Sequence, residues 1–87
     1  MPSTLIYAPR ALKDLEKLPA EATRRILTAL ENLAEKDDPE RSVKRLQDSP
    51  LHSLRVGDYR VILDIKREKI IIFVLRAGLR KKVYHDL

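Results

Sequence analysis

Three arginines and a tyrosine in the C-terminal part of the chain are residue types that handle phosphate groups. Arg76 and Arg80 flank Gly78, where a glycine allows a sharp turn, and Tyr84 follows shortly after Arg80. A guanidinium binds phosphate through paired hydrogen bonds, and a phenol supplies a hydroxyl for proton transfer or a ring for base stacking. Taken singly, each has an ordinary explanation as a solvated arginine or a packed tyrosine. Together with Arg60 they indicate a candidate phosphate site, provided that the fold brings them together.

A β-hairpin is the element that would bring Arg60 to the other residues. Two runs rich in Val, Ile, Leu and Phe, Tyr59 to Lys66 and Lys69 to Arg76, are separated by a short polar connection. Such a connection favours antiparallel pairing of the two runs. The exit of the second strand at Gly78 should therefore lie beside Arg60.

The first run alternates in the manner of a strand with one buried side. One face carries Val61, Leu63 and Ile65, and the other carries Arg60, Ile62 and Asp64. We therefore expect Arg60 to point away from the core onto an open face. Ile70 to Leu75 is apolar on both faces, which predicts a central strand that ends at a break at Ala77-Gly78.

The N-terminal half predicts a strand followed by two helices. Leu5 to Tyr7 is a short apolar strand, and Pro9 suits the first turn of a helix that ends at Pro19. The expected apolar stripe of this helix is Leu12, Leu15 and Leu18. A second helix is expected over Ala20 to Lys36, with one apolar side formed by Ala22, Ile26, Ala29, Leu30 and Leu33. The two helices form a hairpin that must cover the sheet.

The middle of the chain is expected to connect the helices to the sheet. Asp37-Asp38-Pro39 ends the second helix, and Glu40 to Gln47 is predicted to be a loop with at most one turn of helix. Leu51 to Val56 then enters the sheet and Gly57-Asp58 makes a tight turn. A last short strand or a frayed tail is expected over Lys82 to His85. The fold class is α+β: an N-terminal strand, a two-helix hairpin and a three- to four-stranded antiparallel sheet with the helices packed on one face.

Length and composition restrict the possible functions. Eighty-seven residues allow one domain, residues 1–87, and the absence of cysteine excludes disulfides and thiolate chemistry. With only two histidines we expect neither a metal site nor a cofactor. No apolar run approaches the length needed to span a bilayer and no signal peptide is recognisable, so a cytoplasmic protein with no membrane contact is expected.

The positive charge is concentrated in the sheet half of the chain. The net charge is +5, and residues 1–50 carry equal numbers of basic and acidic residues, so the whole excess lies in residues 51–87. A concentrated basic surface favours a polyanionic partner, of which nucleic acid is the commonest. The ordinary alternative is that Lys and Arg only keep a small sheet in solution.

The sequence resembles the RelE/ParE superfamily of bacterial and archaeal toxins, and specifically its RelE branch of ribosome-dependent mRNA endonucleases. The resemblance extends over essentially the whole chain and is carried most specifically by LRVGDYRVILDI and IIFVLRAGLRKKVY. The first of these motifs is shared with relatives that do not cut RNA. The L-R-x-G-x-Y-R turn and the G-x-R-x-x-x-Y ending together favour the RelE branch.

The resemblance assigns roles to individual residues. Arg60 matches the arginine that stabilises charge on the scissile phosphate, Arg80 the one that supports the leaving 5′ oxygen, and Tyr84 the one that helps to activate the 2′ hydroxyl. The RNA-binding set is expected to comprise Arg55, His52, Arg76, Lys81 and Lys82. Where the best-studied pattern has two lysines, this chain has Leu51 and Ser53. His52, which lies between them, is an alternative general base to Tyr84, because its pKa is ordinarily near 6.5, although an exposed strand histidine is the simpler explanation.

The resemblance also implies a function and partners. The expected protein is the toxin of a type II toxin–antitoxin system, a metal-independent endoribonuclease that cleaves mRNA in the A site of the 30S subunit and thereby inhibits translation. Its expected partners are the ribosome, mRNA and a RelB-like antitoxin, with a heterotetrameric toxin–antitoxin complex. The alternatives are a ParE-like inhibitor of DNA gyrase and an inactive member that acts only within the antitoxin complex.

Overall fold

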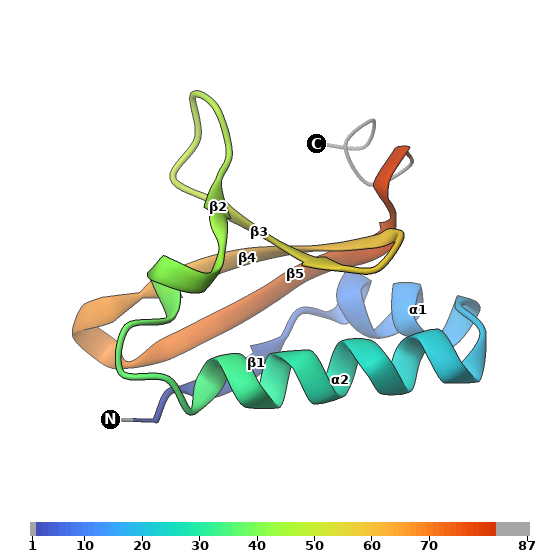
Figure 1. Cartoon of the computed structure of the whole chain (residues 1–87), viewed down its shortest axis with the longest axis horizontal. Coiled ribbons are helices and arrows are strands. Elements are labelled where there is room, and N and C mark those ends of the chain that lie inside the picture. The colour runs from blue at the N-terminus through green and yellow to red at the C-terminus, as the bar shows by residue number, and fades with distance from the viewer. Residues whose placement is uncertain (1, 82–87) are drawn as a thin grey trace.

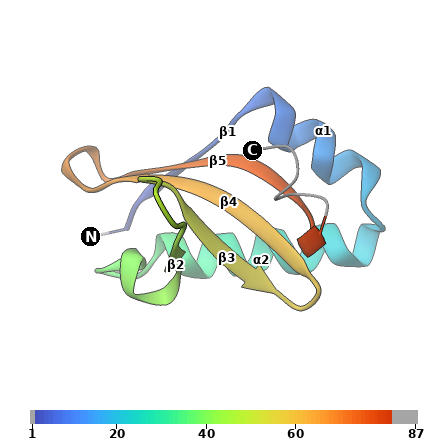
Figure 2. The same ribbon diagram turned by 90° about the horizontal axis from the view of Figure 1, so that it is seen from above.

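The computed structural model describes residues 2–81, and in this part of the chain two helices lie on one face of a single mixed sheet (Figure 1). The elements follow the order strand, helix, helix, strands. Seen from above, the sheet lies in front of the helices, so neither α1 nor α2 covers its other face (Figure 2). In this region no helix is long and apolar enough to cross a membrane.

The helices form as the sequence predicts, with one change in the buried stripe. Helix α1 is Pro9–Lys17 and helix α2 is Ala20–Ala34, and Pro19 separates them. The buried side of α1 is Ala11 and Leu15, whereas Leu12 is 48% exposed. The expected stripe is therefore corrected at one position, where Ala11 is buried in place of Leu12. The step of four residues from Ala11 to Leu15 is closer to the 3.6-residue helical turn than the step of three from Leu12 to Leu15.

The described strands form one five-stranded sheet with the order β1-β5-β4-β3-β2. The strands are β1 (Thr4–Tyr7), β2 (Lys44–Arg45), β3 (His52–Val56), β4 (Tyr59–Lys66) and β5 (Ile71–Leu79). All neighbours are antiparallel except β1 and β5, which are parallel. The sheet therefore has more strands than expected. It is also mixed, because its N-terminal strand joins it beside the last one.

Two short 3-10 helices flank the sheet. The first, η1 (Pro39–Ser42), precedes β2 within the segment that was expected to be a loop. The second, η2 (Arg67–Lys69), connects β4 to β5 and ends at Ile70, which has a left-handed backbone with φ of 55°. The connection between the two strands is therefore longer than the polar pair Arg67-Glu68 that separates the two runs predicted from the sequence.

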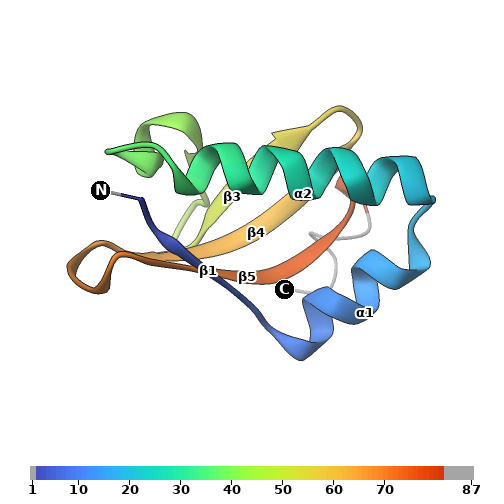
Figure 3. The same ribbon diagram turned by 90° about the horizontal axis from the view of Figure 1, so that it is seen from below.

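The hydrophobic core lies between the helices and the sheet. Its fully buried members come from both layers: Ile26 and Leu30 from α2, Val61 and Leu63 from β4, and Val74 from β5. Figure 3, seen from below, shows α2 running across the strands and α1 beside the end of β5. The two-helix cover on one face of the sheet is confirmed.

One expectation about β5 was wrong and another is confirmed. Gly78 does not break the strand, which continues to Leu79 with Gly78 paired to Arg60. The irregularity lies instead at Ile62/Leu63, where the register with β5 shifts as in a β-bulge. The expectation of a central strand is confirmed, because β5 lies between β1 and β4 and is not an edge strand.

Candidate functional site

Arg60 lies near the start of β4, on the side of the sheet away from the helices. Its cross-strand neighbours are Arg55 on β3 and Gly78 on β5. The adjacent Val61 belongs to the core, so strand alternation turns Arg60 to the opposite face. Arg60 is nevertheless only 9% exposed, and its Nη1 donates to the hydroxyl of Ser53 at 3.5 Å. The face was predicted correctly, but the expectation of an exposed side chain was wrong.

Arg80 follows β5 at the same end of the sheet. Its amide donates to the carbonyl of Asp58 at 3.2 Å, which fixes it beside the β3–β4 turn. Because Gly78 is the partner of Arg60, Arg80 lies two residues beyond that pair. Both Arg80 and Lys81 are exposed. The structure thus brings the backbone of Arg80 close to the strand that carries Arg60, as the hairpin predicted.

The β3–β4 turn adds further positive charge at this end. Arg55 faces the same side as Arg60, is exposed, and its Nε donates to the carbonyl of Gly57 at 3.4 Å. Gly57 has φ of +60°, and Arg25 of α2 packs against it, with Nη2 3.5 Å from the position of an added Cβ. Arg25 was not predicted from the sequence. It lies on a helix, and no local motif links it to a turn thirty-odd residues later.

Arg76 is part of a different interaction at the edge of β5. Its Nε donates to Oδ2 of Asp14 on α1 at 2.8 Å, and both side chains are largely buried. The same carboxylate oxygen accepts the amide of Ala77 at 3.1 Å. Burial raises the pKa of the Asp14 carboxyl, but the hydrogen bonds from Arg76 and Ala77, together with the charges of Arg76 and Arg10, outweigh it and leave that pKa below its ordinary value. Arg76 therefore joins α1 to the sheet.

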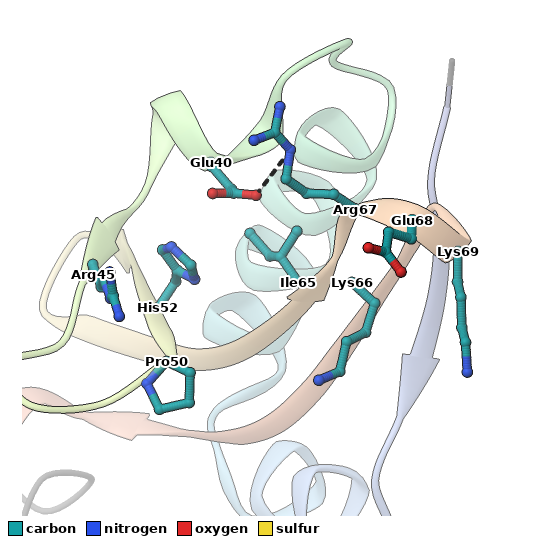
Figure 4. Close-up of a pocket in the computed structure, with 9 residues that line it drawn as sticks. All are labelled: Glu40, Arg45, Pro50, His52, Ile65, Lys66, Arg67, Glu68 and Lys69. Carbon is teal, nitrogen blue, oxygen red and sulfur yellow. Dashed lines mark ion pairs between the residues drawn. The ribbon is translucent and has the colours of Figure 1, made fainter.

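His52 lies on the other side of the sheet from Arg60. It is two residues before Leu54, which packs on the core, whereas Ser53 and Arg55 share the face of Arg60. His52 and Ile65 point to the same side in Figure 4. Within residues 2–81 the buried Nδ1 of His52 has no hydrogen-bond partner. The structure does not bring His52 together with the arginines of the candidate site.

The remaining predicted site residues lie at the chain end. Tyr84 and Lys82, with the expected final strand at Lys82 to His85, are outside the described residues. In the described part of the chain, no group of three or more metal-ligating side chains occurs. The described residues with the clearest common geometry are therefore Arg55, Arg60 and Arg80, at the end of the sheet that carries the β3–β4 turn (Figure 2).

A family model described as the ParE toxin of a type II toxin–antitoxin system, parDE, matches residues 5–84. The chain belongs to this toxin family. The match includes both helices, β2 to β5, β1 from Leu5 onward and the candidate site. A search of curated proteins found no significant match.

Solved structures of RelE toxins show the same fold. The chain is 33% identical to a chain of the toxin–antitoxin complex RelBE2 from Mycobacterium tuberculosis, covering 92% of this chain and 100% of that one, with a TM-score of 0.68. It is 28% identical to a chain of the archaeal RelE–RelB complex from Pyrococcus horikoshii, with coverages of 94% and 99% and a TM-score of 0.76. A mutant of the E. coli toxin RelE in the free state has a TM-score of 0.78 at 24% identity, covering 99% and 93%, and shows the common fold. These likenesses support the RelE branch of the RelE/ParE superfamily.

Proposed function

We propose that this toxin is a ribosome-dependent endoribonuclease that cleaves mRNA in the A site. The observation that supports this most strongly is the placement of Arg60, Arg55 and Arg80 around one end of the sheet. Arg60 and Arg55 are direct cross-strand neighbours on one face. The amide of Arg80 is hydrogen-bonded to the turn between their strands. Three guanidinium groups so placed can surround a phosphate.

The chemistry needs no metal ion. The RNA's own 2′ hydroxyl attacks the adjacent phosphorus, a negatively charged phosphorane forms, and the 5′ oxygen leaves. Arg60 offsets the phosphorane charge, and Arg80 stabilises the leaving oxygen. Tyr84 assists removal of the 2′ proton. A well-aimed donor of this kind contributes about 3–4 kcal/mol to transition-state stabilisation.

The burial of Arg60 fits an electrostatic role. A guanidinium that is held by Ser53 and shielded from water acts with less solvent screening than an exposed one. Its orientation is also set before substrate arrives, so little reorganisation is needed during the reaction. The ribosome supplies the orientation of the mRNA, so free RNA should be cut poorly.

The proposed physiological partner is a RelB-like antitoxin that binds the toxin in the cytoplasm and forms a heterotetrameric complex with it. The two similar solved structures that contain RelB or a RelBE2 antitoxin support this pairing. An acidic or amphipathic antitoxin segment would match the basic sheet half. If the chain is produced at high yield alone, is harmless to the cell and binds no small neighbouring gene product, this part of the proposal fails.

Single-turnover cleavage on programmed ribosomes tests the catalytic proposal. Arg80→Ala should slow cleavage about 10²–10³-fold, since it removes a charge-assisted contact made in the transition state. Because Arg80 is exposed, circular dichroism should show an unchanged fold. Arg24→Ala, an exposed arginine on α2, is the matched control and should cut at the wild-type rate.

Inhibition of DNA gyrase is the second candidate function, because the matching family model is that of the ParE toxins. Supercoiling by gyrase in the presence of the protein separates the two candidates. If the wild type inhibits supercoiling and mapped mRNA ends show no cleavage, the gyrase function replaces the ribonuclease. If neither activity is found and expression alone does not stop growth, the chain acts only within the antitoxin complex.

A further inference from the structure

The turn between β3 and β4 is contacted by an arginine of the helical layer. Nη2 of Arg25 on α2 lies 3.5 Å from the position that a Cβ at Gly57 would occupy, and Nη1 lies 3.8 Å from it. Figure 3 shows the turn beside α2. Because Gly57 has no side chain, the guanidinium group of Arg25 can occupy the space next to the turn. The helical layer thus supplies a cation at the end of the sheet that carries the candidate site.

Arg25 and Arg55 lie against the same residue. Nε of Arg55 is 3.4 Å from the carbonyl oxygen of Gly57, and three bonds join that oxygen to the Cβ position. Nη2 of Arg25 and Nε of Arg55 are therefore at most roughly 11 Å apart. A few nucleotides of a single RNA strand span such a distance, because its phosphates follow one another closely. A strand that is bound by Arg55 would therefore bring a neighbouring phosphate within reach of Arg25.

The cations at this end of the sheet have no acidic partner in the described part of the chain. Within residues 2–81, no ion pair is formed by Arg25, Arg55, Arg80 or Lys81, and all four are exposed. Asp58, the acidic residue of the turn, also forms no ion pair in this range. The side chain of Arg25 makes no hydrogen bond to another described residue. Its donors and its charge are therefore available to an external anion, and phosphate is an anion that arginine binds well.

The preceding arginine of α2 has a different environment. Arg24 borders a groove between α1 and α2, together with Glu16 and Glu31. Like Arg25 it is exposed and lies on the same helix. The two arginines differ in that Arg25 contacts the β3–β4 turn. Arg24 is therefore a matched control for the position of the charge.

We propose that Arg25 is a further RNA-binding residue of this toxin and contacts a phosphate of the mRNA strand beside the one that is cleaved. The inference rests on the proposed function, because it takes the bound strand to be the substrate. The shared contact with Gly57 favours the mRNA strand, since Arg55 lies next to Arg60 on the candidate catalytic face. Arg25 reaches the turn from the helical side of the sheet, away from Arg60. It therefore adds affinity and takes no part in bond cleavage.

Equilibrium binding to ribosomes tests this role separately from cleavage. The ribosomes are programmed with an mRNA that has 2′-deoxy nucleotides in the A site, so the attacking hydroxyl is missing and the strand stays intact. We expect Arg25→Ala to weaken binding about tenfold, since one charge-assisted contact is lost. The slope of log K against log salt concentration should fall by about one. Arg25→Lys keeps the charge and should recover most of both, whereas loss of a mere packing contact with Gly57 would leave the slope unchanged.

Two comparisons locate the contact. Arg24→Ala should leave both the affinity and the salt slope unchanged, and circular dichroism checks that each variant folds. Ribosomes without mRNA should bind Arg25→Ala as they bind the wild type. An equal loss of affinity on these ribosomes would place the contact on ribosomal RNA and overturn the assignment to the mRNA strand.

Cleavage of an unmodified mRNA on the ribosome gives an independent readout. In single-turnover reactions Arg25→Ala should need about tenfold more toxin for the half-maximal rate, with a nearly unchanged maximal rate. The inference is wrong if Arg25→Ala binds programmed ribosomes as tightly as the wild type, or if Arg24→Ala has the same effect. Cleavage by the wild type would still support the proposed function in that case. If the wild type neither binds nor cuts the programmed mRNA, the proposed function fails and this inference fails with it.

Discussion

Asp14 is the side chain through which α1 holds the free edge of β5. Beyond Tyr7 the strand β1 no longer pairs with β5, and the carboxylate of Asp14 accepts both the amide of Ala77 and the guanidinium of Arg76 instead. A buried amide and a buried guanidinium are thus satisfied by one group. Removing it leaves both without this acceptor.

Asp14→Asn should lower the free energy of unfolding by about 1–3 kcal/mol at neutral pH, because a buried charged hydrogen bond is weakened. The pKa of Asp14 in the folded protein is lower than its usual value near 3.8. Its contribution is therefore complete above about pH 4 and is lost as the pH falls through the folded pKa. Urea unfolding from pH 7 down to pH 2 measures this.

The stability difference between wild type and Asp14→Asn should shrink below pH 4. Glu16→Gln, at an exposed position of the same helix, provides the control and should leave the stability nearly unchanged at pH 7. An Asp14→Asn variant with wild-type stability at pH 7 would mean that the contact contributes nothing.

Arg60 should contribute to stability as well as to cleavage. Its side chain is buried beside the hydroxyl of Ser53, so Arg60→Ala leaves a void and an altered hydrogen-bond network. We expect a loss of about 1–3 kcal/mol in chemical denaturation. Arg60→Lys keeps the charge without the planar fork and should restore part of the stability but little of the cleavage. If Arg60→Ala were as stable as the wild type, the buried side chain of Arg60 would not contribute to stability as argued.

At the residue scale, the sequence predicted the face of the sheet on which a side chain lies better than it predicted the burial of that side chain. The period-two alternation placed Arg60 on the correct face, because strand geometry leaves only two faces to choose from. It could not show that Arg60 is buried, since the hydroxyl of Ser53 comes beside its guanidinium only after β3 and β4 pair. For the same reason, the sequence did not predict the partner of Arg76. Its partner Asp14 is 62 positions away, and no local pattern reports such a contact.

At the element scale, α2 carries the largest helical share of the core. Leu30 and Leu33 are 0% and 2% exposed, as their spacing predicted. Leu30→Ala and Leu33→Ala should each lower the free energy of unfolding by about 2–5 kcal/mol, because each leaves a cavity. Leu12→Ala, the same change at an exposed position of α1, should cost far less. Thermal and urea unfolding of the three variants would measure the contrast, and similar losses at Leu12 and Leu30 would refute the assigned helix faces.

The β4–β5 connection contains a residue in an unfavourable conformation. Ile70 adopts φ of 55° and ψ of 46°, a region in which a β-branched side chain is strained by about 1–2 kcal/mol. Ile70→Asn should stabilise the protein by roughly 0.5–1 kcal/mol, since asparagine tolerates this conformation. Lys69→Asn, at the adjacent position inside η2, should give no such gain. Denaturation midpoints of the two variants test the difference.

The elements that the sequence predicted well are those with a strong local period. The helix α2, the strand β4 and the turn at Gly57-Asp58 agree with their expected bounds to within a few residues. The strand β2 was missed because Lys44 and Arg45 have no apolar alternation, and they pair only because β3 offers its edge. The break predicted at Gly78 was wrong because a glycine can remain in a strand when its backbone pairs with a neighbouring strand, as Gly78 does with Arg60 of β4.

At the scale of the whole molecule, the basic excess lies in residues 51–87, which supply β3, β4 and β5. Binding to ribosomes should therefore depend on salt, because each phosphate contact releases counterions. Raising the salt concentration from 50 to 200 mM should weaken binding by at least about tenfold, measured by co-sedimentation. The charge-reversal variant Lys81→Glu should reduce the salt slope, whereas Lys13→Glu on the balanced N-terminal half should not. Binding that is insensitive to salt would argue against phosphate contacts.

The pairing of β1 with β5 also bears on when the protein can fold. Thr4 to Tyr7 find their parallel partners at Ile71 to Val74, near the other end of the chain. During synthesis the first strand must therefore wait, unpaired, until nearly the whole sequence has left the ribosomal exit tunnel. Contacts so distant in sequence also slow folding, since loop closure comes before any gain from pairing. A chain that lacks β5 therefore also lacks the completed sheet end at which Arg60 and Arg80 meet.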